Sequence, residues 1–158
     1  MKLLAIDPGN NDSAYCVIDP KTLRPLESKI VPNDDLLRII KQNKYKETTV
    51  IVIEMVASYG MPVGAEVFET VFWIGQFYAA AELYQHRGRI FRMAVKMHLC
   101  HNSRAKDSNI RQALIDRFGP VGIKKSPGWF YGFKSDMWAA YAVGITYFES
   151  ILKGEIKS

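Results

Sequence analysis

Short apolar segments near the start of this 158-residue chain predict strands. The segments 2–6, 13–18 and 26–31 are rich in apolar and β-branched residues, and turn sequences such as Pro-Gly-Asn-Asn and Asp-Pro-Lys separate them. This spacing predicts three antiparallel strands joined by short turns. The segment 48–54, Thr-Thr-Val-Ile-Val-Ile-Glu, runs without a charge until Glu54, which is typical of a central strand buried on both faces.

Helical spacing of apolar residues follows in four segments. Asn33 is expected to cap the first helix, the long second helix ends before Gly88, and a fifth strand is expected at 89–93. The third helix stops at Gly119-Pro120, and Ser135 is expected to cap the last helix. The positions that define the four stripes are Leu36, Leu37, Ile39 and Ile40; Phe68, Val71, Phe72, Gly75 and Ala79; Ile110, Leu114 and Phe118; and Trp138, Tyr141, Ala142 and Ile145.

Three antiparallel strands followed by alternating helices and strands predict one α/β domain over residues 1–158. The expected sheet is mixed and five-stranded, with helices on both faces. No run approaches the roughly 20 apolar residues of a membrane span, and Asp7 interrupts the apolar start before it could form a signal peptide. Two cysteines are too few for a disulfide framework. We therefore expect a soluble cytoplasmic protein without a membrane partner.

Positive charge is concentrated in one part of the chain. The net charge is only +5, but residues 86–134 contain eleven Lys and Arg, all three His and two acids, and the remainder is net negative. A basic block in an otherwise acidic chain indicates a polyanionic partner, and nucleic acid is the commonest one. A solvated basic face gives the same composition and stays open as the alternative.

Acidic residues stand where two predicted strands end. Asp7 and Glu54 would converge if their strands are neighbours, and Asp136 in the first turn of the last helix could reach the same edge. Converging carboxylates repel one another unless a cation lies between them, and oxygen ligands favour Mg²⁺ or Mn²⁺. Two such ions about 4 Å apart can activate water and stabilise the leaving oxygen of a phosphodiester. A turn-capping role for Asp7 and dipole compensation by Asp136 remain the structural alternatives.

Five motifs in order resemble the RuvC family of Holliday-junction resolvases, especially its phage-encoded branch. They are AIDPGNNDSAY, IVIEMVASYG, VFWIGQFYAAAELYQHRGRI, VKMHLCHNSRAKDSNIRQAL and SDMWAAYAVGI, and they run nearly end to end. The resemblance implies a ribonuclease H-like fold, a homodimer built in part by the long helix, and metal ligands at Asp7, Glu54 and Asp136. It also implies DNA-contacting lysines at Lys96 and Lys106, with Lys106 close to the chemistry. Ala139 departs from the family pattern, which usually has a second metal-competent residue there.

Further residues are weaker candidates. Tyr59 follows Glu54 in the region where the family presents a stacking aromatic, and the loop aromatics can stack on bases or anchor the loop. His98, Cys100 and His101 form one soft cluster without a distant partner, which argues against zinc. No Gly-rich phosphate loop is present, so we expect no nucleotide cofactor. The remaining DNA-binding candidates are Arg104, Arg111, Lys124 and Lys125; the loop aromatics are Trp129, Phe130, Tyr131 and Phe133.

These features predict a divalent-metal-dependent endonuclease that cleaves Holliday junctions or related branched DNA such as forks and flaps. It is expected to work as a homodimer with Mg²⁺ or Mn²⁺, in the cytoplasm of a bacterial host if it is phage-encoded. Because of Ala139, a branched-DNA-binding protein with weak or lost catalysis is the alternative. An actin-like sugar kinase or ATPase shares a strand-Asp-Gly opening, but this chain is too short for that duplicated fold.

Overall fold

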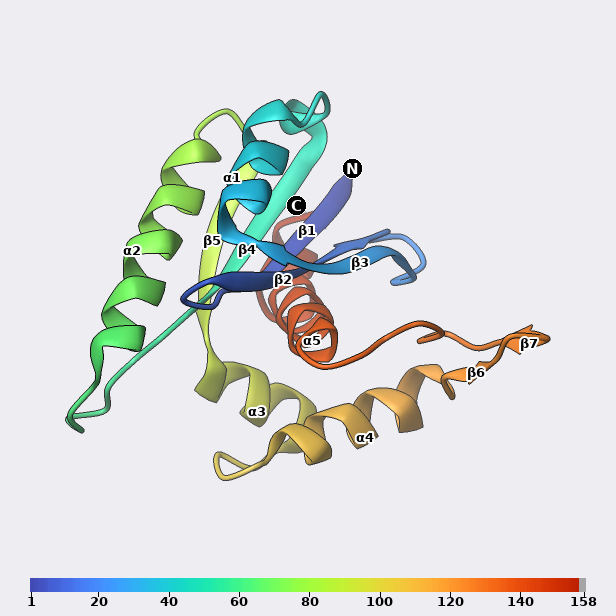
Figure 1. The fold of residues 1–158 in the computed structure, drawn as a ribbon. Coiled ribbons are helices and arrows are strands. Elements are labelled where there is room, and N and C mark those ends of the chain that lie inside the picture. The colour runs from blue at the N-terminus through green and yellow to red at the C-terminus, as the bar shows by residue number, and fades with distance from the viewer. Residues whose placement is uncertain (157–158) are drawn as a thin grey trace.

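Five strands form one sheet in the order β3-β2-β1-β4-β5, seen in Figure 1. The computed structural model describes residues 1–156. The first three strands are antiparallel neighbours, whereas β4 and β5 run parallel to β1, so the predicted mixed five-stranded sheet is confirmed. The strands are β1 (Lys2–Asp7), β2 (Asp12–Ile18), β3 (Pro25–Pro32), β4 (Thr49–Met55) and β5 (His86–Phe91).

Helices cover both faces of this sheet. Figure 1 shows the first two helices on one face and α5 on the other, with α3 and α4 beyond one end of the sheet and a thin hairpin projecting from the body. No helix in residues 1–156 combines the length and apolar character needed to cross a membrane. The helices are α1 (Asn33–Gln42), η1 (Lys46–Thr48), α2 (Ala65–Ala80), α3 (Arg92–Cys100), α4 (Asp107–Phe118), α5 (Met137–Tyr147), η2 (Phe148–Leu152) and α6 (Lys153–Ile156); the hairpin consists of β6 (Gly122–Ile123) and β7 (Ser126–Pro127).

Alternating strand residues divide the core into two layers. Because successive side chains of a strand point to opposite faces, each central strand contributes to both layers. The residues packed on the α5 side include Leu3, Ala5, Val50 and Val52, and those on the α1 and α2 side include Leu4, Ile6, Ile51 and Ile53. This alternation decides which way the acids at the strand ends point.

Helix α5 lies very close to the sheet at Gly144. A Cβ atom at this position would lie 2.5 Å from Ile18 Cδ1 and 2.9 Å from the Cβ atom of Ala5. Glycine therefore allows the helix to approach β1 and β2 closely, and this contact sets the height of α5 above the sheet.

The two helix caps expected from the sequence are wrong. Helix α1 begins after Pro32 with no side-chain cap, because the buried Asn33 amide accepts a hydrogen bond from Ser13 Oγ at 2.5 Å and donates one to the Gly9 carbonyl at 2.9 Å. Ser135 is likewise not the cap of α5: its φ is +48°, Asp136 holds the cap position, and no side chain caps the helix. Asn33 instead ties the loop after β1 to the start of α1.

Both bounds of the predicted fifth strand differ from the structure. The fifth strand is His86–Phe91 rather than 89–93, because its pairing with β4 ends at Met55 and Phe91. The unpredicted helix α3 starts at the next residue, Arg92.

Helix α2 ends at Ala80, and the aromatic part of its predicted stripe faces outward, since Phe68 and Phe72 are 66% and 64% exposed.

Candidate active site

Asp7 and Glu54 lie at the C-terminal ends of two neighbouring strands, along one edge of the sheet, and on the same face of it. The parallel strands β1 and β4 are direct neighbours, and their last paired residues are Ile6 and Ile53. Asp7 and Glu54 each follow one residue later, in step with the residues that point toward α5. The convergence expected at this edge is therefore what the register of the two strands produces.

Asp136 approaches the same edge from the start of α5, where it occupies the cap position. Burial, and then the negative charges of Glu54 and Asp136, raise the pKa of Asp7 to about 8, although the nearby Arg92 acts in the opposite direction. The negative charges of Glu54 and Asp136 thus disfavour the ionisation of Asp7 beside them. Such an environment favours the binding of a cation.

Glu54 is the most buried of these acids, with 8% of its side chain exposed. Burial raises its pKa, while the positive charges of Arg92 and Lys96 lower it. Arg92 Nη1 lies 3.4 Å from Glu54 Oε2 and forms an ion pair with it. A buried carboxylate is costly without a cationic partner, and in this structure Arg92 is that partner.

Arg92 also pairs with Asp107, the first residue of α4. Sequence reasoning missed both residues as members of the site, because they belong to a helix that was not predicted and to the start of the next one. A usable signal was the position of Arg92, one helical turn before Lys96 on the same helix. We call the edge of the sheet with Asp7, Glu54 and Asp136 the acidic edge. Arg92 is therefore a cationic side chain at the acidic edge that two acids, Glu54 and Asp107, bind.

Two hollows open beside Arg92. One, of about 210 Å³, is lined by Glu54, Tyr59, Arg92 and Lys96 among others. The other, of about 40 Å³, is lined by Arg92 together with Asp107, Ile110, Ser135, Asp136, Trp138 and Ala139. Ala139 thus lies in the same hollow as Asp136, which is three residues before it in the chain.

The donor atoms at this edge suit a hard divalent cation, since Asp7, Glu54 and Asp136 offer only carboxylate oxygens. Within residues 1–156, no three His, Cys, Asp or Glu side chains stand in an arrangement that could hold a metal ion. Glu54 Oε2 instead accepts a hydrogen bond from the cationic guanidinium of Arg92. The donor set, three carboxylates, fits a metal such as Mg²⁺ or Mn²⁺.

Several predicted DNA contacts lie around this edge. Lys96 and the 65% exposed Tyr59 line the hollow of Glu54, and Arg111 lies over the ring of Trp138 at 4.8 Å. Lys106 is exposed directly before Asp107. Arg104 is exposed in the loop between α3 and α4, and Lys124 and Lys125 stand at the turn of the projecting hairpin in Figure 1.

The aromatic loop before α5 is largely an anchor. Phe130 is fully buried, with ring centroids 4.7 Å from Trp138 and 5.2 Å from Tyr141, so base stacking by Phe130 is excluded. Tyr131 remains exposed. His98 lies in hydrogen-bond contact with Glu149, with 3.1 Å between Nε2 and Oε1.

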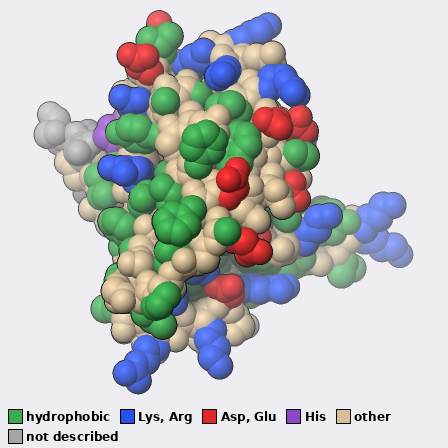
Figure 2. All heavy atoms as spheres, turned by 60° about the vertical axis from the view of Figure 1, so that its left-hand side comes forward, with side chains coloured by type: hydrophobic (Ala, Val, Ile, Leu, Met, Phe, Trp, Pro, Cys, Tyr) green, Lys and Arg blue, Asp and Glu red, His purple; other side chains and the backbone are tan. Residues whose placement is uncertain are grey.

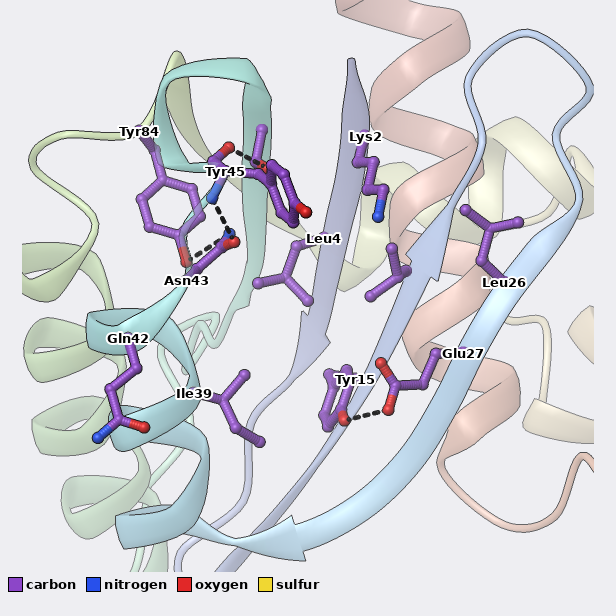
Figure 3. A pocket seen from close by; sticks show the side chains of 12 residues that line it. Lys2, Leu4, Tyr15, Leu26, Glu27, Ile39, Gln42, Asn43, Tyr45 and Tyr84 are labelled. Carbon is purple, nitrogen blue, oxygen red and sulfur yellow. Dashed lines mark hydrogen bonds between the residues drawn. The ribbon is translucent and has the colours of Figure 1, made fainter.

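A larger hollow of about 390 Å³ lies elsewhere, on the α1 side of the sheet (Figure 3). Leu4, Ile39 and Tyr45 point toward it, and the hydrogen bond from the Tyr15 hydroxyl to Glu27 Oε1, 3.1 Å long, closes one side. It lies toward the start of β1, whereas Asp7 ends this strand. The acidic edge, rather than this hollow, collects the candidate catalytic groups.

Comparison with solved structures identifies the fold. RuvC from Thermus thermophilus superposes with a TM-score of 0.72, and the match covers 98% of this chain and 97% of that one at 18% identity. The chain has the RuvC fold. T. thermophilus RuvC in complex with a Holliday junction substrate matches with a TM-score of 0.67 at 16% identity, again over 98% and 97% of the two chains.

The predicted ribonuclease H-like fold is thereby confirmed, and the RuvC fold extends over almost the whole chain. No protein-family model and no curated protein sequence matches the chain. The likeness to RuvC therefore rests on the arrangement of the backbone, and the functional argument rests on the side chains at the acidic edge.

Proposed function

We propose that the protein is a divalent-metal-dependent endonuclease that cleaves Holliday junctions or related branched DNA. The observation that carries this proposal is that Asp7 and Glu54 end neighbouring strands of a RuvC fold and that the charges of Glu54 and Asp136 both act on Asp7. The proposal is supported by T. thermophilus RuvC, which has been solved with a Holliday junction substrate. We expect the protein to act in the cytoplasm, and in a bacterial host if a phage encodes it.

In this proposal, Asp7, Glu54 and Asp136 bind the metal as carboxylates. A bound Mg²⁺ or Mn²⁺ supplies activation of a water molecule and neutralises charge on the leaving oxygen of the phosphodiester. Lys96, which lines the hollow of Glu54, and Lys106 would hold or polarise the phosphate near the cut. Arg111 would bind the DNA backbone beside it, and Tyr59 would stack on an unpaired base.

A cleavage assay on synthetic DNA tests the proposal. Four-way junctions, forks, flaps and linear duplexes of matched sequence are incubated with the protein, with and without Mg²⁺ or Mn²⁺. We expect nicking of a branched substrate that requires the metal. Tight binding of branched DNA without nicking in either metal would instead identify a branched-DNA-binding protein with lost catalysis.

Ala139 is the observation that favours this second candidate, because its methyl group offers no ligand in the hollow of Asp136. We expect the site to work with three acids and Mn²⁺ to be more effective than Mg²⁺, since Mn²⁺ binds such ligand sets more tightly. Ala139→Asp should lower the metal concentration that gives half-maximal cleavage. Identical half-saturation of wild type and variant in both metals would show that position 139 does not contribute to metal binding.

Lys96→Ala and Lys106→Ala should each weaken DNA binding and slow cleavage. If each lysine contacts a phosphate, the slope of log affinity against log salt should fall by about one for each variant. Lys41→Ala, at the end of α1, removes the same charge on the opposite face of the sheet and should leave the slope unchanged. Losses that are independent of salt concentration would argue against phosphate contacts.

The homodimer is proposed to form through α2. Figure 2 shows hydrophobic side chains gathered on the face that α2 presents, and the exposed hydrophobic residues of α2 are Phe68, Val71 and Phe72. Contiguous apolar surface on a helix commonly marks a protein interface. A two-fold dimer would present two active sites to the symmetry-related strands of a four-way junction.

Replacing both Phe68 and Phe72 with Glu is expected to convert the dimer to a monomer, measured by light scattering. Leu26→Glu introduces one such charge at another exposed apolar residue, on β3, and should leave the mass unchanged. A monomeric mass for wild type, both free and with junction DNA, would contradict the dimer.

A further inference from the structure

Arg92 is placed between the acids of the proposed site. Its side chain is shared by the linings of both hollows: Glu54 lines one of them, and Asp136 and Ala139 line the other. Its positive charge also acts on Asp7. Arg92 therefore stands where the carboxylates would need to approach one another around a metal ion.

Two acids hold the guanidinium in this position. Glu54 binds it from the buried side, at 3.4 Å, and Asp107 binds it from the exposed side. The side chains of Glu54, Arg92 and Asp107 are 8%, 30% and 85% exposed, so the three form a row from the interior to the solvent. A guanidinium can donate to two carboxylates at once because it is a planar group with five N–H donors.

We propose that Arg92 is a built-in counter-cation that competes with the divalent metal for Glu54, and that Asp107 positions it. This inference rests on the proposed function and adds a residue pair that controls metal loading. In the metal-free protein, Arg92 neutralises the buried carboxylate of Glu54. Metal binding requires Glu54 to exchange the guanidinium for the ion, and Asp107 opposes this exchange because it holds the guanidinium against Glu54.

Competition for one carboxylate has a thermodynamic consequence. The free energy of the pair between Arg92 and Glu54 is lost when the metal binds, so the pair weakens the apparent metal affinity. The same pair stabilises the metal-free fold, because without it Glu54 is a buried charge without a partner. Removing the guanidinium should therefore tighten metal binding and destabilise the metal-free protein.

Mn²⁺ binding to the free protein, in the absence of DNA, tests the inference. Titration calorimetry or electron paramagnetic resonance of free Mn²⁺ gives the dissociation constant without any cleavage. Arg92→Gln is expected to lower this constant by about threefold or more relative to wild type, and to lower the melting temperature in chelator. Arg38→Gln, which breaks a surface ion pair with Asp35, is the matched control and should leave the Mn²⁺ affinity unchanged.

Asp107→Asn tests the positioning role. It should change the Mn²⁺ affinity in the same direction as Arg92→Gln, and it should have no further effect once Arg92 is Gln. A loss of affinity in both backgrounds would overturn this role, because Asp107 would then be a metal ligand itself. Arg92→Lys keeps the charge but has no planar guanidinium to bind both acids. Its Mn²⁺ affinity is expected to lie between those of wild type and Arg92→Gln.

Two results would overturn the inference in distinguishable ways. Equal Mn²⁺ affinities of wild type, Arg92→Gln and Arg92→Lys, in proteins that bind Mn²⁺, would remove the competition but leave the metal site intact. Absence of Mn²⁺ binding in all variants, including Arg92→Gln, would remove the metal site and the proposed nuclease with it.

Discussion

Asp7→Asn and Glu54→Gln are each expected to lower the rate of junction cleavage by about 100-fold or more. The loss of one carboxylate removes several kcal/mol of transition-state stabilisation, and each ~1.4 kcal/mol corresponds to a tenfold change in rate. Junction binding should be preserved or tightened, because the replaced carboxylate repels the DNA backbone. Single-turnover cleavage and gel-shift titration of the same junction measure the two effects separately.

Asp34→Asn is the matched control for this prediction. Asp34 is an exposed acid in the first turn of α1, on the other face of the sheet, and its replacement changes the charge equally. Cleavage by this variant should match wild type. Full cleavage by purified Asp7→Asn or Glu54→Gln protein would contradict the assignment of the acidic edge as the active site.

Phe130→Ala is expected to destabilise the fold by about 3–5 kcal/mol, which is the usual cost of emptying a fully buried aromatic site. The ring of Phe130 packs between α4 and α5, with centroids 6.3 Å from Phe118 and 4.7 Å from Trp138. Because domains of this size are stable by only about 5–15 kcal/mol, such a loss is a large share of the total. Urea denaturation at equilibrium gives the free energy of unfolding.

The neighbouring Tyr131 provides a control for Phe130. Tyr131 is 48% exposed, so Tyr131→Ala should change the free energy of unfolding by no more than about 0.5 kcal/mol. An equal effect of the two substitutions would mean that the loop before α5 is not anchored by Phe130. Trp138, which packs on Phe130, also lines the hollow of Asp136. Phe130→Ala should therefore also reduce cleavage at urea concentrations below the denaturation midpoint.

The central strands could be predicted because their signal is local. Uninterrupted β-branched and apolar residues favour a buried strand wherever the chain places it, and the predicted segments correspond to β1 to β4 with small shifts at the ends. Asp7 and Glu54 could be singled out for the same reason, since an acid at the end of such a strand is visible in the sequence. Even the placement of Ala139 beside Asp136 follows from helical periodicity.

The helix caps show where local reasoning fails. Asn33 is a good capping residue, yet its side chain binds Ser13 and the Gly9 carbonyl, which are more than 19 residues away in the chain. A long-range hydrogen bond in a buried setting outweighs a local cap, because buried polar groups must find partners. The outward stripe of α2 has a similar cause, since the packing against the sheet selects Ile74 and Phe77 for burial instead of Phe68 and Phe72.

The sequence by itself determined the strand segments, the acids at their ends and the basic character of the second half. Only the tertiary structure decided that β1 and β4 are neighbours, and hence that Asp7 and Glu54 meet on the α5 face. It also decided the place of Arg92, whose two partners lie 38 and 15 residues away along the chain. The physical reason is that periodicity and propensity act over a few residues, whereas charge pairing and strand register depend on distances that exist only in the folded chain.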